Sequence, residues 1–317
     1  MTVNYNSPIS PMPKANPDRL DRIYSKIMAV SRPSDALRKT LASMRGLTEE
    51  QIEDFIAAPI DNRTIVQKIL DDGSFEPRDL LGVPGFYLTE VPNGRLCPEN
   101  IKFKYHPNTE CVIAVRDEED RIIALQSRTR YSNSGCRYIW YSSAGEIYGV
   151  TSNSPLGIVP GKGLTERKTG QPFRIAVCEG FFKAAAIARS MDIDCVIFAN
   201  GIQNTSPLLG LLQRIVCIWK HLSILIVPDM DFLTNKEVMK AYAKLTSTVL
   251  NITKDVTVLA WPAALGKGYD DVLLSGNGGC CRVLPVSRFR DALCNEAARK
   301  GDPKLMDYIN NYFHGRI

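Results

Sequence analysis

The chain has 317 residues, of which 44% are hydrophobic and 23% are charged, and its formal net charge is +5. This length and composition allow a substantial buried core, and no apolar run approaches the ~20 residues that a membrane span needs. The N-terminus lacks the apolar segment of a secretory signal, so we expect a cytoplasmic protein with no membrane partner. The nine cysteines form no C-x-x-C pair, which argues against a zinc site. The modest positive charge permits a polyanionic partner without requiring one.

The N-terminal part of the sequence predicts a tail followed by helices. Residues 1–17 are polar and contain prolines, and we expect them to form a flexible tail. Residues 18–60 show helical apolar spacing in "LDRIYSKIMAV" and "SDALRKTLASMRGLTEEQIEDFIAAP". Thr48 is a good N-cap residue, and Gln51 stands where its capping-box partner is expected. A small helical N-terminal segment is therefore expected.

Residues 61–170 have the pattern of an antiparallel α+β subdomain. "CVIAVRDEEDRIIALQSRTR" holds two β-rich runs separated by a charged turn, and "CRYIWYSS" adds a third run. Lys102 and Lys104 alternate with Phe103 and Tyr105, so these aromatic rings either stack on single-stranded nucleic acid or lie in the core. The stretch "TSNSPLGIVPGKGLTERKTGQP" is rich in Gly, Pro, Ser and Thr, and we expect a loop between subdomains there.

Residues 171–279 show a regular alternation of strands and helices. "RIAVC" precedes "FFKAAAIARSM", "CVIFAN" precedes "SPLLGLLQRIV", "LSILIVPD" precedes "NKEVMKAYAKLTSTVL", and "DVTVLAW" closes the set. Short apolar strands that alternate with helices predict a Rossmann-like α/β fold, with a parallel sheet covered on both faces. Residues 280–317 follow, and "RFRDALCNEAARKGDPKLMDYINNYF" predicts one or two short helices.

Acidic residues follow three of the predicted strands. Glu179 comes directly after the first strand, Asp229 and Asp231 after the third, and Asp270 and Asp271 after the fourth. Ligands of parallel sheets gather at the carboxyl ends of the strands, and residues i and i+2 of an extended segment point to the same side. Neighbouring carboxylates repel unless a cation separates them, and an all-oxygen cluster suits Mg²⁺ or Mn²⁺. The alternative for an isolated D-x-D is a solvated turn that caps a helix.

Together these stretches carry a resemblance to a known family. "VCEGFFKAAAIA", "FANGIQN", "ILIVPDMDFLTNKEVMKAYAKL" and "KGYDDVLL" resemble a Toprim domain, the metal-binding catalytic fold of bacterial primases, topoisomerases and some nucleases. Upstream, "LASMRGLTEEQIEDF" and the β-rich runs are similar to the bacterial primase core, which disfavours a topoisomerase. "GVPGFY" and "KGYDD" are similar to primase-like Toprim proteins of phages, plasmids and other mobile elements. The resemblance covers roughly residues 35–276.

The resemblance implies roles for the acidic residues. Glu179 matches the residue that acts as a metal ligand or as a general acid/base, and Asp229 and Asp231 match the magnesium-binding pair. Asp270 and Asp271 lie where the family places its last acidic pair. They are adjacent, whereas the family usually has one residue between the two acids, so the resemblance leaves open which of them faces the metal.

The resemblance also implies contacts with nucleic acid and nucleotide. The basic residues expected there are Lys102, Lys104, Arg116, Arg128, Arg130, Arg137 and Lys183. Lys183, on the first turn after Glu179, could reach a phosphate. Each of these side chains could instead be a solvated surface charge, and capping of the following helix is sufficient to explain Asn235.

The function implied is that of a primase-like nucleotidyltransferase, which would use a bound metal and nucleoside triphosphates to copy single-stranded DNA into a short primer. Such an enzyme would serve the replication of a phage, plasmid or mobile element. The sequence contains neither the family's zinc module nor a G-x-x-x-x-G-K-[ST] motor motif. We therefore expect a separate template-recognition protein or a replicative helicase as a partner.

Two other functions stay open at this point. A Toprim nuclease would use the same carboxylates to cleave a phosphodiester with water, and only the upstream primase-like sheet disfavours it. A non-catalytic DNA-binding replication accessory protein would keep the fold without the chemistry. In that case Asp229→Ala would leave DNA binding intact.

Overall fold

The computed structural model describes residues 12–90, 96–131, 137–166, 170–199, 201 and 205–316. The chain forms two compact units: unit 1 comprises Met1–Lys39 and Thr48–Pro155, and unit 2 comprises Thr40–Leu47 and Leu156–Ile317. The five-part division made from the sequence stays a prediction. Within the described ranges, no helix is both long and apolar enough to cross a lipid bilayer.

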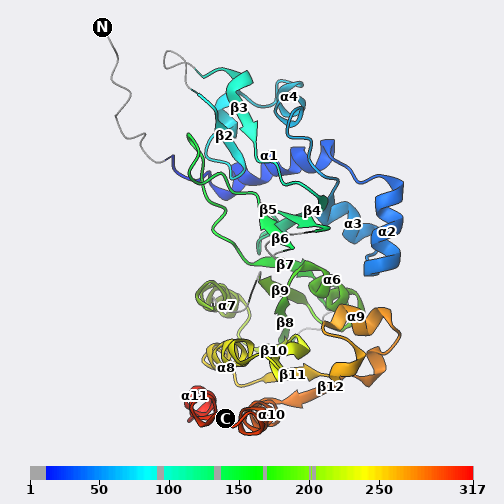
Figure 1. The fold of residues 1–317 in the computed structure, drawn as a ribbon, viewed down its shortest axis with the longest axis vertical. Coiled ribbons are helices and arrows are strands. Elements are labelled where there is room, and N and C mark those ends of the chain that lie inside the picture. Colours follow the sequence, from blue (N-terminus) through cyan, green and yellow to red (C-terminus); the bar gives the residue numbers. More distant parts are fainter. Residues whose placement is uncertain are drawn as a thin grey trace. The chain divides into compact units, whose positions relative to one another are not determined.

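The N-terminal helices form where the apolar spacing predicts them (Figure 1). They are α1 (Pro17–Val30), α2 (Asp35–Arg45), whose second half from Thr40 belongs to unit 2, α3 (Glu49–Phe55) and α4 (Ile65–Leu70). The predicted capping box at the start of α3 is confirmed, because the Thr48 side chain accepts from the Gln51 N–H and the Gln51 side chain accepts from the Thr48 N–H. Part of the expected tail, residues 1–11, lies outside the described residues. Ala15 is buried, and its N–H donates to the Gly82 carbonyl.

Unit 1 contains the predicted antiparallel sheet, in the order β1-β4-β5-β6. Its strands are β1 (Ile56–Ala57), β4 (Thr109–Arg116), β5 (Ile122–Thr129) and β6 (Tyr138–Trp140), and a separate hairpin pairs β2 (Phe86–Leu88) with β3 (Ile101–Phe103). Leu20, Ile23 and Ile27 lie on one face of α1 and are buried with residues of this sheet. Burial of such an aliphatic side chain stabilises the fold by ~1.5–3 kcal/mol.

Unit 2 is built on a six-stranded sheet in the order β12-β11-β10-β8-β9-β7. The strands are β7 (Gly157–Pro160), β8 (Phe173–Glu179), β9 (Cys195–Ala199), β10 (Leu222–Val227), β11 (Val256–Ala260) and β12 (Arg282–Pro285). The four central strands are parallel, as predicted, and the two edge strands are antiparallel to their neighbours. The expectation of a loop was wrong for 157–160, because these residues pair with the backbone of β9.

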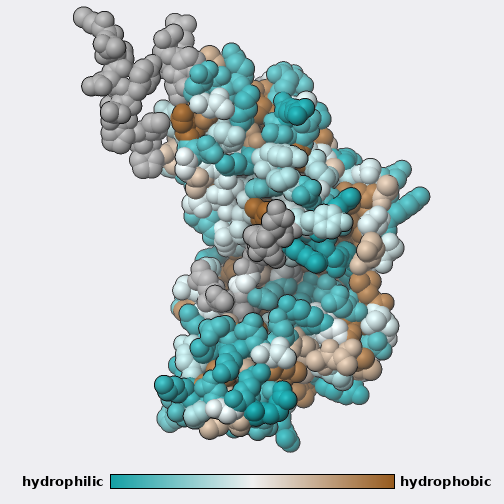
Figure 2. All heavy atoms as spheres, viewed as in Figure 1, coloured by the Kyte–Doolittle hydropathy of each residue, from teal (hydrophilic) through white to brown (hydrophobic). Residues whose placement is uncertain are grey.

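Helices cover both faces of the unit 2 sheet, as expected. They are α5 (Gly163–Glu166), α6 (Phe181–Ser190), α7 (Ser206–Ile218), α8 (Lys236–Leu250), α9 (Tyr269–Leu274), α10 (Val286–Arg299) and α11 (Pro303–Phe313). Figure 1 shows α6 and α9 on one face and α7 and α8 on the other. The two C-terminal helices are confirmed and pack against α8, and hydrophilic side chains predominate over this region in Figure 2. Residues 200 and 202–204 of "FANGIQN" lie outside the described residues.

The connections of the sheet create a switch point between two neighbouring strands. β8 pairs with both β9 and β10, and the chain reaches β9 through α6 but reaches β11 from β10 through α8. Because α6 and α8 cover opposite faces, the segments that leave β8 and β10 diverge (Figure 1). Open α/β sheets bind ligands at the carboxyl ends of strands at such a point.

Candidate functional site

The first acidic residue stands at the carboxyl end of β8. Glu179 is the last residue of this strand and is half-buried. The next residue, Gly180, has φ +75° and ψ 151°, and its N–H donates to the Ala199 carbonyl at 3.0 Å. This turn brings the start of α6 over the end of the strand. All residues from 181 to 188 are buried, including the charged Lys183.

The D-x-D pair follows the neighbouring strand β10. Asp229 is extended, with φ −79° and ψ 136°, but Asp231 lies in a short 3-10 helix, η4 (Met230–Leu233). The expectation of a fully extended segment was therefore wrong, because the Phe232 N–H bonds back to the Asp229 carbonyl and closes a turn. The two carboxylates nevertheless share one cation: Lys267 Nζ lies 2.8 Å from Asp231 Oδ2 and 3.5 Å from Asp229 Oδ2.

A second lysine contacts the same aspartate from the other side. The Lys183 ammonium forms an ion pair with Asp229 Oδ1, and only 5% of the Lys183 side chain is exposed. Burial lowers the pKa of Lys183, and the nearby charges of Glu179 and Asp270 oppose this shift. The solvated surface charge considered for Lys183 is thereby ruled out. Its contact with a phosphate stays a prediction.

The adjacent aspartates at the start of α9, Asp270 and Asp271, lie in different surroundings. Asp271 is exposed, and its Oδ2 accepts from the Gly268 N–H at 3.4 Å, which caps the helix. Burial, followed by the charge of Asp271, raises the pKa of Asp270, and the Lys183 ammonium opposes this rise. Asp270 is thus the member of the pair that lies in the field of Lys183.

Two contributing residues escaped the sequence analysis. Lys267 stands in "GKGYDD", where the flanking glycines could have suggested an exposed loop with a mobile cation. Tyr242 is buried on α8, and its hydroxyl oxygen accepts from the Asp229 N–H at 2.9 Å. No pattern in the sequence distinguishes this tyrosine from an ordinary core residue.

The fit of a metal ion can be judged from these donors. Among the described residues, no three His, Cys, Asp or Glu side chains form a group that could hold an ion. The ammoniums of Lys183 and Lys267 contact the carboxylates of Asp229 and Asp231 instead. Within the same residues, Asp231 Oδ1 is buried and accepts no hydrogen bond. Carboxylate oxygens are the ligands that Mg²⁺ and Mn²⁺ prefer. The two aspartates therefore fit one hard cation in the place of the exposed Lys267 ammonium.

The segment 102–105, which begins in β3, divides its side chains between core and solvent. Phe103 is fully buried, which confirms the core alternative for that ring, whereas Tyr105 is 61% exposed. Lys104 forms an ion pair with Glu146 and lies 5.2 Å from the centre of the Tyr87 ring. Lys102, also exposed, donates to a backbone carbonyl three residues earlier.

The four predicted arginines fall into two classes. Arg116 donates to the Asp54 carbonyl at 3.0 Å, and Arg128 is 7% exposed and forms an ion pair with Glu110. Arg130 and Arg137 are exposed instead.

The two exposed arginines lie on segments that backbone hydrogen bonds join at one end of the sheet. The Arg130 N–H donates to the Asn108 carbonyl and the Thr129 N–H to the Arg137 carbonyl, so the backbone at 108, 129–130 and 137 is contiguous. Tyr131 is 77% exposed. We call Lys104, Tyr105, Arg130, Tyr131 and Arg137 the basic–aromatic strip.

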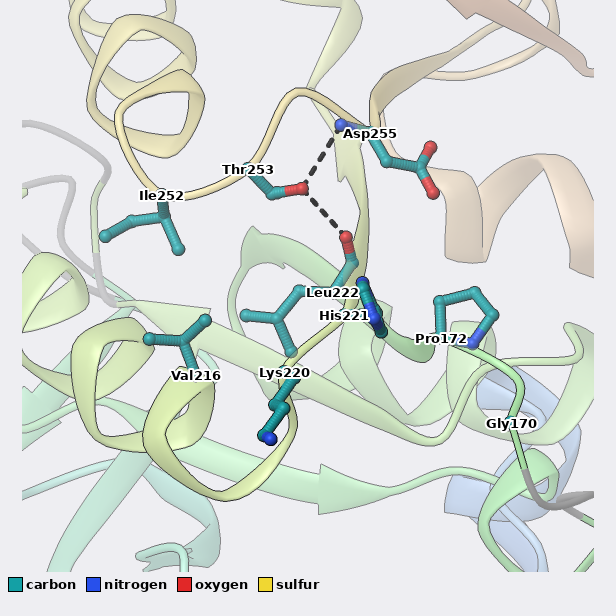
Figure 3. Close-up of a pocket in the computed structure, with 9 residues that line it drawn as sticks. All are labelled: Gly170, Pro172, Val216, Lys220, His221, Leu222, Ile252, Thr253 and Asp255. Atoms are coloured by element: carbon teal, nitrogen blue, oxygen red, sulfur yellow. Dashed lines mark hydrogen bonds between the residues drawn. The ribbon is translucent and has the colours of Figure 1, made fainter.

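A pocket of about 360 Å³ lies at the opposite, amino-terminal edge of the unit 2 sheet (Figure 3). It is lined by Gly170, Pro172, Val216, Lys220, His221, Leu222, Ile252, Thr253 and Asp255. The Thr253 hydroxyl donates to the Leu222 carbonyl and accepts from the Asp255 N–H, so it ties two loops together (Figure 3). This pocket holds none of the predicted site residues.

No family model and no curated protein matches the chain. Solved structures do match it. The zinc-binding and RNA polymerase domains of Aquifex aeolicus primase align with a TM-score of 0.59 and 15% identity over 95% of this chain and 70% of that one. The RNA polymerase domain of Mycobacterium tuberculosis primase DnaG, solved with double-stranded DNA, aligns with a TM-score of 0.58 and 15% identity over 93% of this chain and 98% of that one. A DnaG primase catalytic domain bound to single-stranded DNA aligns with a TM-score of 0.56 and 16% identity over 90% of this chain and 83% of that one.

These alignments run through both units, and their low identity limits what they show to the fold. The antiparallel sheet of unit 1, the parallel-centred sheet of unit 2 and the helices on both of its faces agree with that match. The chain has the α/β fold of the DnaG primase catalytic core, which is a Toprim fold.

Proposed function

We propose that the chain is a primase-like nucleotidyltransferase that joins nucleotides on a single-stranded DNA template with the help of Mg²⁺ or Mn²⁺. The observation that carries this proposal is the shared cation position of Asp229 and Asp231, located at the switch point of a primase-core fold. Glu179 stands at the end of the adjacent strand β8. Similarity of "GVPGFY" and "KGYDD" to proteins of mobile elements supports a role in the replication of a phage, plasmid or related element.

The residues of the site would divide the work of phosphoryl transfer. Asp229 and Asp231 would hold the metal ion, which would supply charge stabilisation to the transferred phosphoryl group and activation of the attacking 3′-hydroxyl. Tyr242 fixes the backbone of Asp229, and Lys183 balances the charge of its carboxylate. Glu179 would complete the metal shell or accept a proton. Asp270 adds negative charge behind Lys183, and Asp271 caps α9.

The basic–aromatic strip of unit 1 is the part that we assign to the template. Arginine and lysine bind phosphates, and exposed tyrosines offer faces on which bases stack. Lys102 extends this surface along β3. Arg116 and Arg128 are weaker candidates because only 18% and 7% of their side chains are exposed. The relatives solved with DNA support a DNA-binding role of this kind. A separate template-recognition protein or a replicative helicase would be a further partner.

A primer-synthesis assay tests the proposal. The chain is incubated with unlabelled single-stranded DNA of mixed sequence, Mg²⁺ or Mn²⁺, and labelled ribonucleotides or deoxynucleotides in separate reactions. We expect short labelled products, and we expect Asp229→Asn combined with Asp231→Asn to reduce their formation by at least ~100-fold, because both ligands of the cation are lost. Asp307→Asn, at an exposed position of α11, is the matched control and should leave synthesis unchanged.

The same assay separates the alternatives when an end-labelled strand is included. Shortening of that strand, abolished by the double variant, would identify a nuclease and contradict our proposal. Binding of the strand by wild type and double variant alike, with no synthesis by either protein, would identify an accessory protein.

A further inference from the structure

The two lysines in the carboxylate cluster are held very differently. Lys183 is 5% exposed and lies on the first turn of α6, whose residues from 181 to 188 are all buried. Lys267 is 61% exposed and lies on a loop between Gly266 and Gly268. The Lys267 ammonium can therefore move into solvent, whereas the Lys183 ammonium cannot do so without disruption of the start of α6.

The buried Lys183 ammonium is paired with a carboxylate, because it forms an ion pair with Asp229 Oδ1. A Cβ atom at Gly268 would lie 3.4 Å from Lys183 Cε and 2.4 Å from Asp270 Oδ1, so this glycine leaves room for both side chains. A buried ammonium is strongly unfavourable unless it is paired, and Asp229 supplies the pairing.

The outer part of the cluster, where Lys267 contacts Asp231, is held by an exposed lysine instead of a buried one. Lys267 Nζ is 2.8 Å from Asp231, and among the described residues Asp231 Oδ1 is buried without a hydrogen-bond donor. The Lys267 carbonyl accepts from the Met230 N–H at 2.9 Å. The loop backbone is thus tied to the D-x-D turn independently of the Lys267 side chain. A cation can replace this ammonium without displacement of the loop.

We propose that Lys183 is a permanent built-in cation at the inner position of the cluster, and that the site consequently binds a single divalent ion at the outer position vacated by Lys267. The inference rests on the proposed function, which takes Asp229 and Asp231 as metal ligands. Once Lys267 is displaced, Lys183 offsets one of the four negative charges on Glu179, Asp229, Asp231 and Asp270, and one divalent ion offsets two more. The fixed positive charge of Lys183 repels a second ion from the inner carboxylates.

The test is a count of Mn²⁺ ions bound to the full chain, with free Mn²⁺ followed by electron paramagnetic resonance. We expect one ion for the wild type. Lys183→Met keeps the length of the side chain but removes its charge, so it should bind a second ion or bind the first at least about tenfold more tightly. Lys267→Met should still bind one ion, also more tightly. Lys240→Met removes a lysine that is paired with Glu237 outside the cluster, and it should behave as wild type.

The outcomes separate this inference from the proposed function. Two ions bound to the wild type would overturn it, whether or not any variant folds, and so would an unchanged count and affinity in a folded Lys183→Met protein. If Lys183→Met does not fold, Lys183→Gln and the wild-type count decide the question. Absence of Mn²⁺ binding by the wild type would remove the metal site itself, and both proposals would fail. One bound ion without primer synthesis would support this inference and contradict the proposed function alone.

Discussion

Gly180 sets the direction in which the chain leaves β8. Its φ of +75° and ψ of 151° lie in a region that is almost closed to residues with a side chain, although an added Cβ would have no atom within 4 Å. Gly180→Ala should therefore lower the free energy of unfolding by ~1–3 kcal/mol through backbone strain alone. Because Glu179 and Lys183 flank this turn, Mn²⁺ affinity should fall as well. Urea denaturation and the Mn²⁺ titration measure the two effects.

Gly279→Ala is the matched control for that substitution. Gly279 does not have a positive φ, and its added Cβ also has no atom within 4 Å. The change should alter stability by no more than about 0.5 kcal/mol. Equal losses in the two alanine variants would show that the conformation of Gly180 is not what stabilises the turn.

At the scale of residues, the position of an acidic side chain can be predicted from the sequence when the residue follows a recognisable strand. Glu179 and Asp229 could be positioned in this way, because the end of a buried strand is visible as the end of an apolar run. Lys267 could not, because its contact with Asp231 depends on how a loop distant in sequence returns to the strand end. The burial of Lys183 could not be predicted from the sequence either, because a lysine on a first helical turn is ordinarily solvated.

At the scale of elements, helix α8 depends on its N-cap. Asn235 Oδ1 accepts from the N–H groups of Glu237 and Val238, as the sequence predicts for this position. Asn235→Ala should cost ~0.5–2 kcal/mol of stability, and Asn235→Asp should retain the cap. Because α8 also carries Tyr242, which holds the Asp229 N–H, fraying of its start should weaken Mn²⁺ binding in the alanine variant only. Thermal denaturation and Mn²⁺ titration of the two variants check this, and equal behaviour would contradict it.

The sequence predicts long elements better than short ones. Strands such as β8 and β10 carry four consecutive apolar residues, and helices such as α8 show a sustained helical spacing of apolar residues, so both are visible locally. β1 and β7 are strands only because the edges of β4 and β9 offer them backbone partners. The turn of η4 likewise depends on hydrogen bonds made after β10 ends. Such features belong to tertiary structure and leave little trace in a local pattern.

At the scale of the whole molecule, the strand order explains why a chain only about 15% identical to the solved primases keeps their fold. A parallel sheet covered on both faces needs apolar strands and amphipathic helices in the right order, and many sequences meet that requirement. The switch point between β8 and β10 then follows from connectivity. The position of the site is thus more predictable than the identity of the cation that occupies it.

The assignment of template and metal to different compact units makes the two binding activities separable. Tyr105→Ala should weaken binding of single-stranded DNA by roughly 5- to 100-fold, the loss expected for one stacked base, without a change in Mn²⁺ affinity. Arg130→Ala should weaken binding less at high salt than at low salt, because a phosphate contact is lost. Fluorescence anisotropy of a labelled oligothymidylate at two salt concentrations measures both effects. Arg299→Ala, at an exposed position of unit 2, is the control. An equal loss in that variant would place the template elsewhere than on the basic–aromatic strip.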